Sequence, residues 1–190
     1  MLHVGSTAPS FELPDARMEM IQLSSFRGKK NVVLYFYPRD GTPVCTREAI
    51  EYSDNEEEFS ECDTVVMGVS RDDWMVHEEF CDKHGISVRL LSDTDCEVSR
   101  KYEVMMEHSA NGANDTNAAG GNANGDANGN ANGNANGDAN SARREGTQER
   151  VRRCTFIIDK KGVLRHILHD MNPREHVGNV LGLVRQIHGH

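Results

Sequence analysis

Cys45 lies where a buried strand is expected to end and a helix to begin. The run 31–37 is apolar and β-rich, as in a buried central strand, and helical sequence extends from about Cys45 to Glu61. Free backbone N–H groups and the positive end of the helix dipole would then face the sulfur and favour the nucleophilic thiolate. The hydroxyl of Thr42, three residues earlier, could hydrogen-bond a molecule bound there. Alternatively, Thr42 only caps the helix and Cys45 packs in the core.

The chain contains five cysteines, which are scattered rather than clustered. A secreted disulfide scaffold would be shorter and denser in cysteine, and no Cys-x-x-Cys pair is present. In a reducing compartment most such cysteines are small buried hydrophobes, with a minority reactive or metal-bound. The five are Cys45, Cys62, Cys81, Cys96 and Cys154.

Strands and helices alternate along the part of the chain that must position Cys45. Apolar β-rich runs predict strands over 31–37, 64–70, 88–91, 155–159 and 163–168, the last two joined as a hairpin. Capping residues and apolar periodicity predict helices over 45–61, from Asp72 or Asp73 to His84, over 93–102, and from Pro173 onwards. This order predicts a three-layer α/β domain with a central mixed sheet.

A low-complexity tract interrupts this pattern. Residues 109–148 are rich in Asn, Gly and Ala, with repeated Ala-Asn-Gly and no large apolar side chain over most of their length. Such a segment cannot bury enough surface to offset the entropy lost on ordering. We therefore expect residues 1–190 to form a single domain with a flexible surface insertion at 109–148. A tether or binding tract is the alternative.

Charge and hydropathy exclude two classes of partner. The formal net charge of −9 disfavours a nucleic-acid binder, because phosphate contacts need clustered Lys and Arg. No run of 18 apolar residues exists, so no membrane partner is expected. The N-terminal residues lack the basic and apolar regions of a secretory signal, which predicts a cytoplasmic protein.

The residues around Cys45 resemble a known family. Pro38-x-x-x-Thr42-x-x-Cys45 matches the active-site motif of peroxiredoxins, and residues 36–38 with 45–48 resemble their Q-type branch, also called bacterioferritin-comigratory protein. The resemblance also covers 5–14, 23–28, 91–93 and 153–159. It implies a thioredoxin-like fold, with a central mixed sheet flanked by helices, and a thiol-dependent peroxidase active in antioxidant defence.

The resemblance assigns roles to three residues of the motif. It implies that Cys45 is the peroxidatic cysteine, that Thr42 hydrogen-bonds the peroxide, and that Pro38 shields the site from water. The Cys45 thiolate would attack a peroxide oxygen and become a sulfenic acid. A second thiol would condense with it, and thioredoxin or a similar dithiol protein would reduce the product. Hydrogen peroxide and small organic hydroperoxides are the implied substrates, no cofactor or metal is needed, and a monomer is expected.

An arginine and a glutamate complete the implied site. Arg153 matches the family's active-site arginine, whose permanent cation would hold the thiolate and stabilise charge as the O–O bond breaks. The adjacent Arg152 would point to the other side of a strand, so an error of one residue is a real alternative. Glu48 matches a position that often orients this arginine. It could equally be a solvated helix carboxylate.

The second thiol is less well defined. Many members of the branch carry a resolving cysteine five residues after the nucleophile, where this chain has Ile50. Other members carry it at a position that resembles Cys81, which we expect to resolve Cys45 after local unwinding, because a disulfide needs Cα atoms within about 7 Å. A one-cysteine mechanism with an external thiol is the alternative.

Two other classes of function are possible. A zinc site could use Cys81 and His84 with His188 and His190, although four convergent ligands are not evident. A thioredoxin-fold holdase or thiol-exchange protein without peroxidase turnover is the second alternative. The remaining histidines have no evident partners and are expected at the surface or in packing: His3, His77, His108, His166, His169 and His176.

Overall fold

The computed structural model describes residues 1–108, 148–170, 172 and 174–189. One compact unit comprises Met1–Met106 and Glu149–His190, and the account below concerns that unit. The second unit, Glu107–Gln148, lies almost entirely outside the described residues, as does the predicted insertion over 109–148. The single-domain organisation therefore stays a prediction.

The core of the first unit is a mixed five-stranded sheet with the order β5-β4-β3-β8-β9. Its strands are β3 (Asn31–Phe36), β4 (Thr64–Ser70), β5 (Arg89–Ser92), β8 (Cys154–Ile158) and β9 (Leu164–His169). β3, β4 and β5 are parallel, whereas β8 is antiparallel to β3 and β9 is antiparallel to β8. All six residues of β3 are buried, because helices and loops cover both faces of this central strand. The predicted strands and the hairpin are confirmed.

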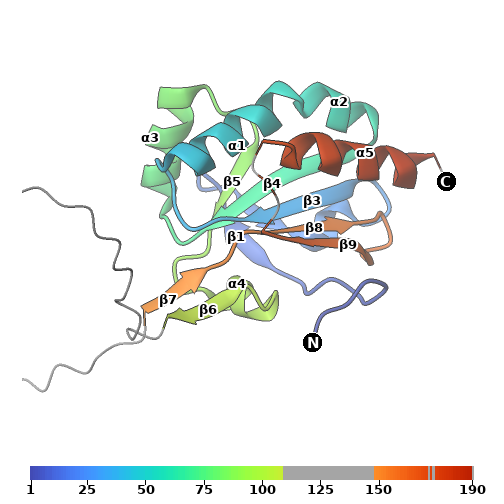
Figure 1. The fold of residues 1–190 in the computed structure, drawn as a ribbon, viewed down its shortest axis with the longest axis horizontal. Helices are drawn as coiled ribbons and strands as arrows, with labels where there is room; N and C mark the ends of the chain where they lie inside the picture. Colours follow the sequence, from blue (N-terminus) through green and yellow to red (C-terminus); the bar gives the residue numbers. More distant parts are fainter. Residues whose placement is uncertain (109–147, 171, 173, 190) are drawn as a thin grey trace, which may run out of the picture. The chain divides into compact units, whose positions relative to one another are not determined.

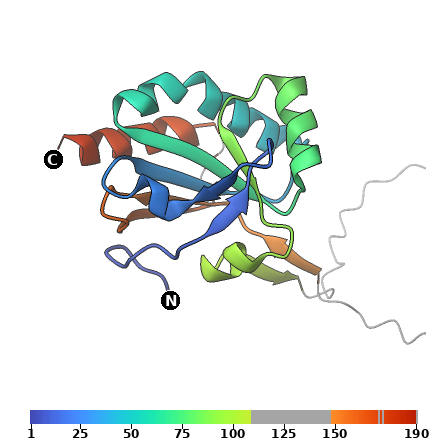
Figure 2. The ribbon, with the colours of Figure 1, turned by 180° about the vertical axis from the view of Figure 1, so that it is seen from behind.

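Different elements cover the two faces of the sheet (Figures 1 and 2). One face carries α1 (Pro43–Asp54), α2 (Glu56–Glu61), α3 (Trp74–His84) and α5 (His176–His188). The other carries α4 (Glu97–Lys101), β1 (Glu12–Pro14), β2 (Met20–Gln22) and a 3₁₀ turn, η1 (Leu23–Phe26). Successive residues of β3 point to opposite faces of the sheet. Tyr35 packs in the hydrophobic cluster on the α1 side, and Phe36 packs in the cluster on the α4 side.

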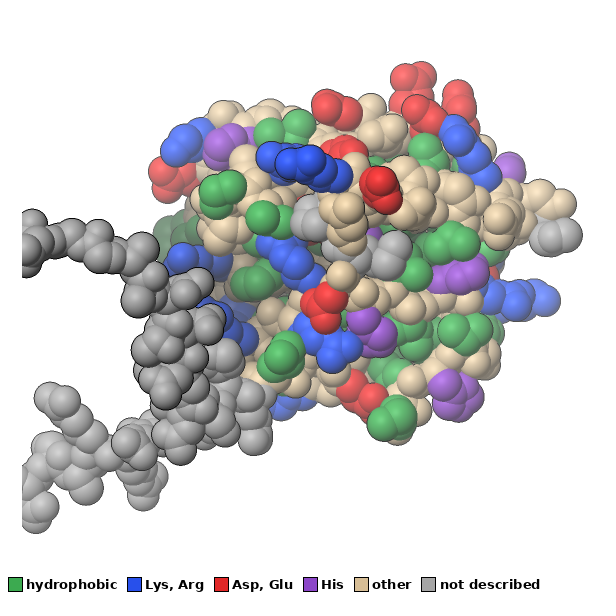
Figure 3. All heavy atoms as spheres, in the orientation of Figure 1, with side chains coloured by type: hydrophobic (Ala, Val, Ile, Leu, Met, Phe, Trp, Pro, Cys, Tyr) green, Lys and Arg blue, Asp and Glu red, His purple; other side chains and the backbone are tan. Residues whose placement is uncertain are grey.

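Two further strands, β6 (Met105–His108) and β7 (Gln148–Val151), pair with each other. On the face shown in Figure 3, basic and acidic side chains are interspersed rather than gathered by sign. Within the part of the chain that the structure describes, no helix is both long enough and apolar enough to cross a bilayer.

Two predicted helices are shorter than expected, each for a local reason. The stretch 45–61 forms two helices, because Asn55 leaves helical geometry and its side chain donates to the carbonyl of Glu51 at 2.7 Å. The stretch 93–102 is helical only from Glu97, because the buried Asp93 carboxylate accepts from Ser99 N and Cys96 has a positive φ of 60°. The last helix begins at His176, and Pro173 lies outside the described residues.

Candidate active site

Cys45 is the third residue of α1 and is 2% exposed. Thr42 is the N-cap: its backbone is extended, and its hydroxyl accepts a hydrogen bond from the backbone N–H of Cys45 at 3.2 Å. Pro43 occupies the first helical position, where its missing N–H costs nothing. The capping role of Thr42 is therefore confirmed, and its contact with peroxide stays a prediction.

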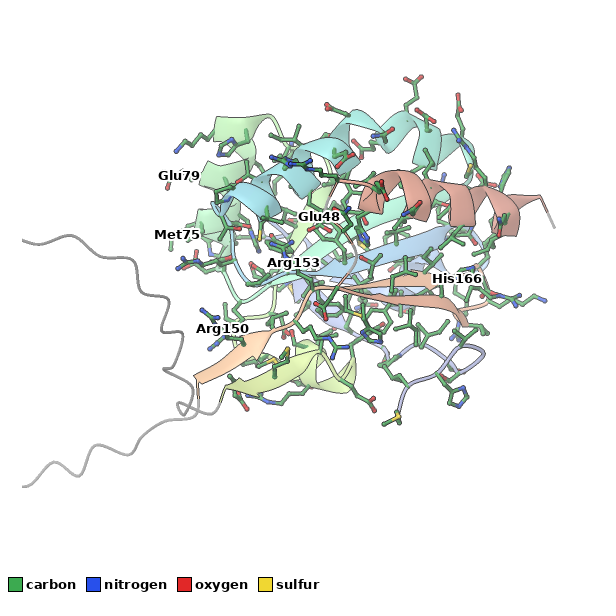
Figure 4. All side chains as sticks on the ribbon, in the orientation of Figure 1. Glu48, Met75, Glu79, Arg150, Arg153 and His166 are labelled. Atoms are coloured by element: carbon green, nitrogen blue, oxygen red, sulfur yellow. The ribbon has the colours of Figure 1, made fainter. Side chains whose placement is uncertain are left out.

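Arg153 joins Cys45 to Glu48. Its Nη2 donates to the sulfur of Cys45 at 2.8 Å, and its Nη1 donates to Oε2 of Glu48 at 2.7 Å. The pairing of Phe36 with Cys154 explains this contact, because it brings the start of β8 beside the end of β3. Figure 4 shows Arg153 and Glu48 close together under α1. A permanent cation thus contacts the sulfur directly, which stabilises a thiolate.

Arg152 points elsewhere. Its guanidinium lies 2.8 Å from Nδ1 of His169 and 3.4 Å from the carboxylate of Asp170. The two neighbouring arginines therefore diverge, and Arg153, rather than Arg152, contacts Cys45. Glu48 is likewise a buried partner of this arginine and not a solvated carboxylate.

The environment of Glu48 is unusual for a carboxylate. Burial raises the pKa of Glu48 to about 7, even though the charge of Arg153 opposes the shift. On its other side lies His176, whose Nε2 is 3.6 Å from Oε1 of Glu48 and 2.8 Å from the hydroxyl of Thr155. Burial, and then Arg153, lower the pKa of His176 to about 4. His176 is therefore neutral at pH 7, and its contact with Glu48 is not an ion pair.

The raised pKa of Glu48 predicts a stability difference that depends on pH. Between about pH 4.5 and 7 the folded chain holds the Glu48 proton more tightly than the unfolded chain, so this residue's contribution to stability falls as pH rises. Glu48→Gln does not titrate at this position, so its free energy of unfolding does not contain that decrease. From pH 5 to pH 7, the free energy of unfolding of Glu48→Gln should rise relative to that of the unmodified chain by about 2–3 kcal/mol.

Urea unfolding at pH 5, 6 and 7 measures this difference. His176 contributes in the opposite sense below pH 6.5, but it is present in both proteins and cancels in the comparison. Glu79→Gln removes an exposed carboxylate on α3 and serves as the control, for which no pH-dependent difference is expected. Parallel profiles for Glu48→Gln and the unmodified chain would contradict the assignment of Glu48.

Pro38 and Cys81, the other predicted site residues, make no hydrogen bond to the Cys45 sulfur among the described contacts. Pro38 is exposed and lies in the loop between β3 and α1, so its shielding of the site stays a prediction. Cys81 is a half-buried free thiol on α3. Burial, and then the charge of Asp40, raise the pKa of the Cys81 thiol to about 11. Cys81 nevertheless packs against the same core cluster as Cys45.

The other three cysteines are buried free thiols without a cationic hydrogen-bond donor at the sulfur among the described contacts. Burial raises the pKa of Cys154 to about 12 and raises that of Cys96 as well. Cys62 closes α2 in the core. These environments are typical of structural cysteines.

The predicted zinc ligands do not form a cluster among the described residues, and His190 lies outside them. The candidate group that the described residues do form is Asp40, Asp72 and His77, whose ligand atoms lie within 4.8 Å of one another. Nδ1 of His77 and Oδ2 of Asp40 are only 2.6 Å apart. This is hydrogen-bond distance and leaves no room for an ion between them.

The chain is similar to several known proteins. Residues 4–167 match the AhpC/TSA family. A putative peroxiredoxin bcp of Coxiella burnetii is 33% identical over 181 residues, which cover 95% of this chain and 97% of that protein. Peroxiredoxin Bcp of Escherichia coli K12 is 28% identical over 97% of each chain. Peroxidoxin BcpB of Mycobacterium tuberculosis is structurally similar, with a TM-score of 0.74, 24% identity, and coverage of 98% of this chain and 99% of that one.

The fold and the site define a thioredoxin-like protein with a cysteine at a helix N-terminus, and the predicted fold is confirmed. The chain belongs to the AhpC/TSA family, and within it to the Q-type peroxiredoxins. It is accordingly a thiol-dependent peroxidase.

Two contacts in this region were not foreseen. His176 is buried, which agrees with the expectation of a packing residue, but its contact with Glu48 was not expected. His77 was given no partner, and that expectation is wrong, because it is fully buried against Asp40. For both histidines the only signal in the sequence was the residue type. Their partners, Glu48 and Asp40, lie far away along the chain and in other elements.

Proposed function

We propose that Cys45 is the residue that reduces peroxide, with hydrogen peroxide and small organic hydroperoxides as substrates and antioxidant defence as the role. The observation that carries this proposal is the contact of 2.8 Å between Nη2 of Arg153 and the Cys45 sulfur. That contact occurs at the N-terminus of α1, where the helix dipole also favours negative charge. Both features stabilise the thiolate that attacks an O–O bond.

The reaction follows from this arrangement. The electron pair of the Cys45 thiolate forms an S–O bond with one peroxide oxygen, and the O–O bond breaks. The departing oxygen leaves as hydroxide or alkoxide and takes up a proton to give water or an alcohol. Arg153 stabilises the negative charge that moves from sulfur to this oxygen, and Glu48 holds the guanidinium in place. Thr42 and Pro38 would contact the bound peroxide from the loop before α1.

The sulfenic acid is then resolved by Cys81, and thioredoxin or a similar dithiol protein reduces the disulfide. Cys81 supports this proposal because it is half-buried and packs in the same core cluster as Cys45, whereas Cys62, Cys96 and Cys154 are buried. We further propose that the chain acts as a cytoplasmic monomer. A one-cysteine cycle with an external thiol is the second candidate, favoured by the high pKa of the Cys81 thiol.

One experiment tests both steps. The reduced protein receives one equivalent of hydrogen peroxide, free thiols are blocked, and peptides are mapped by mass spectrometry without reduction. We expect a bond between Cys45 and Cys81, and in Cys81→Ser a sulfenic or sulfinic acid at Cys45. If the unmodified chain also stops at the sulfenic or sulfinic acid, the cycle uses one cysteine. A Cys45 that stays a free thiol would contradict the whole proposal.

A further inference from the structure

A buried hydrogen-bonded pair joins the loop before Cys45 to α3. The side chain of His77 is 0% exposed and that of Asp40 is 3% exposed. Nδ1 of His77 lies 2.6 Å from Oδ2 of Asp40, and Nε2 lies 3.2 Å from the carbonyl oxygen of Leu91. Because both ring nitrogens face oxygen acceptors, the pair holds a proton between Nδ1 and Oδ2 as well as the one on Nε2. Breaking such a buried hydrogen bond is costly, because it leaves polar groups without a partner away from water.

Asp40 is held on its other sides too. The hydroxyl of Tyr37 donates to Oδ1 of Asp40 at 2.6 Å, and the backbone N–H of Asp40 donates to Asp72 at 2.8 Å. Asp72 also accepts from the hydroxyl of Ser70 at 2.7 Å. The loop is thereby tied to the end of β3, to the end of β4 and to α3.

The pair also joins the two segments that carry the cysteines of the proposed cycle. Asp40 precedes the N-cap Thr42 by two residues and Cys45 by five. His77 and Cys81 are four residues apart on α3, so they share one face of that helix. Asp40 is moreover one of the charges that raise the pKa of the Cys81 thiol. One bond therefore fixes the helix of Cys81 against the loop of Cys45.

In this closed arrangement the two cysteines suit different steps. The Cys45 sulfur contacts the guanidinium of Arg153, which suits its attack on peroxide. Cys81 is half-buried and largely un-ionised at neutral pH, which makes it a poor nucleophile. Separating α3 from the loop would expose Cys81 to water and remove it from the charge of Asp40, and both changes favour its thiolate.

We propose that Asp40 and His77 are positioning residues that form a latch between the active-site loop and α3. The latch is closed while Cys45 reacts with peroxide and opens before Cys81 attacks the sulfenic acid. In that attack the electron pair of the Cys81 sulfur forms the S–S bond and the S–O bond of Cys45 breaks. The hydroxide that leaves takes up the proton of the Cys81 thiol, giving water. The inference rests on the proposed resolving role of Cys81.

His77→Leu tests the latch. It removes the bond to Asp40 and keeps an apolar side chain of similar size. We expect the bond between Cys45 and Cys81 to form about tenfold faster, as the loss of one buried hydrogen bond implies. Excess peroxide should then produce less sulfinic acid at Cys45, and peroxide attack itself should become slower. Opposite changes in the two rates identify a latch if the free energy of unfolding by urea shows that the variant is otherwise as stable as the unmodified chain.

Trp74 provides the signal for these rates. It is the only tryptophan of the chain and the first residue of α3, so stopped-flow fluorescence reports on this helix. Mass spectrometry of quenched samples identifies each product. Glu79→Gln, on the exposed side of the same helix, should leave both rates unchanged (Figure 4).

Two milder variants keep the test valid if His77→Leu folds poorly. In Asp40→Asn the amide can still donate to Nδ1 of neutral His77, so the disulfide rate should rise less than in His77→Leu. Tyr37→Phe removes one bond to Asp40 and should give a smaller change in the same direction. If the disulfide forms in the unmodified chain but no faster in these variants, the latch is wrong. If it never forms there, both the resolving role of Cys81 and the latch are wrong.

Discussion

Replacing Cys45 by serine should abolish peroxide consumption, with kcat/KM falling by at least about 10³-fold. A serine hydroxyl is not ionised at neutral pH, and serine has no sulfur that peroxide could oxidise to a sulfenic acid. The contact with Arg153 cannot compensate, because no thiolate is present for it to stabilise. The measurement is the initial rate of hydrogen peroxide loss in the presence of excess dithiol.

Cys62→Ser is the matched control for this substitution. Cys62 is also buried, at 7% exposure, and belongs to the same core cluster as Cys45. It is the C-cap of α2, and the contact of Arg153 is with Cys45 rather than with Cys62. Its replacement should lower stability without removing the activity. Retained peroxide consumption in a folded Cys45→Ser, checked by circular dichroism, would refute the central assignment.

The local features of this site could be predicted from sequence. The cap of Thr42 on Cys45 is a contact over three residues, and the strand over 64–70 is defined by its own apolar run. Such features depend on spacing and side-chain type alone. The break at Asn55 was missed because helical periodicity continues across it, while the deciding contact is a side-chain hydrogen bond to the backbone.

Contacts between distant segments were harder to foresee. Arg153 is 108 residues from Cys45, and only the resemblance to a family pointed to it, with an error of one residue to Arg152 as the alternative. Glu48 could not be assigned because its burial depends on how α5 packs on α1. The pair of Asp40 and His77 likewise forms only once α3 lies against the loop. These are properties of tertiary packing, which periodicity does not encode.

Replacing Arg153 by glutamine should slow the reaction of Cys45 with peroxide by about 10²–10³-fold, the usual cost of losing one preorganised charge-stabilising donor. Glutamine keeps a polar side chain but loses the cation and the forked geometry that reaches sulfur and carboxylate together. Arg153→Lys keeps the charge and should recover part of the rate. The second-order rate constant with hydrogen peroxide, measured before disulfide formation, isolates this step.

Arg152→Gln is the control, because Arg152 contacts His169 and Asp170 instead of the sulfur; its rate with peroxide should stay close to that of the unmodified chain. Equal losses in the two arginine variants would mean that net charge near the site matters rather than the contact with Cys45.

A double-mutant cycle then separates the arginine from the carboxylate. If Glu48 acts only by holding the guanidinium, Glu48→Gln should slow peroxide attack in the unmodified chain and have no further effect in Arg153→Gln. Additive losses would instead indicate that Glu48 contributes independently of Arg153. Non-additive losses would show that the 2.7 Å contact orients the cation, which makes Glu48 a positioning residue and leaves Arg153 as the group that stabilises the reacting atoms.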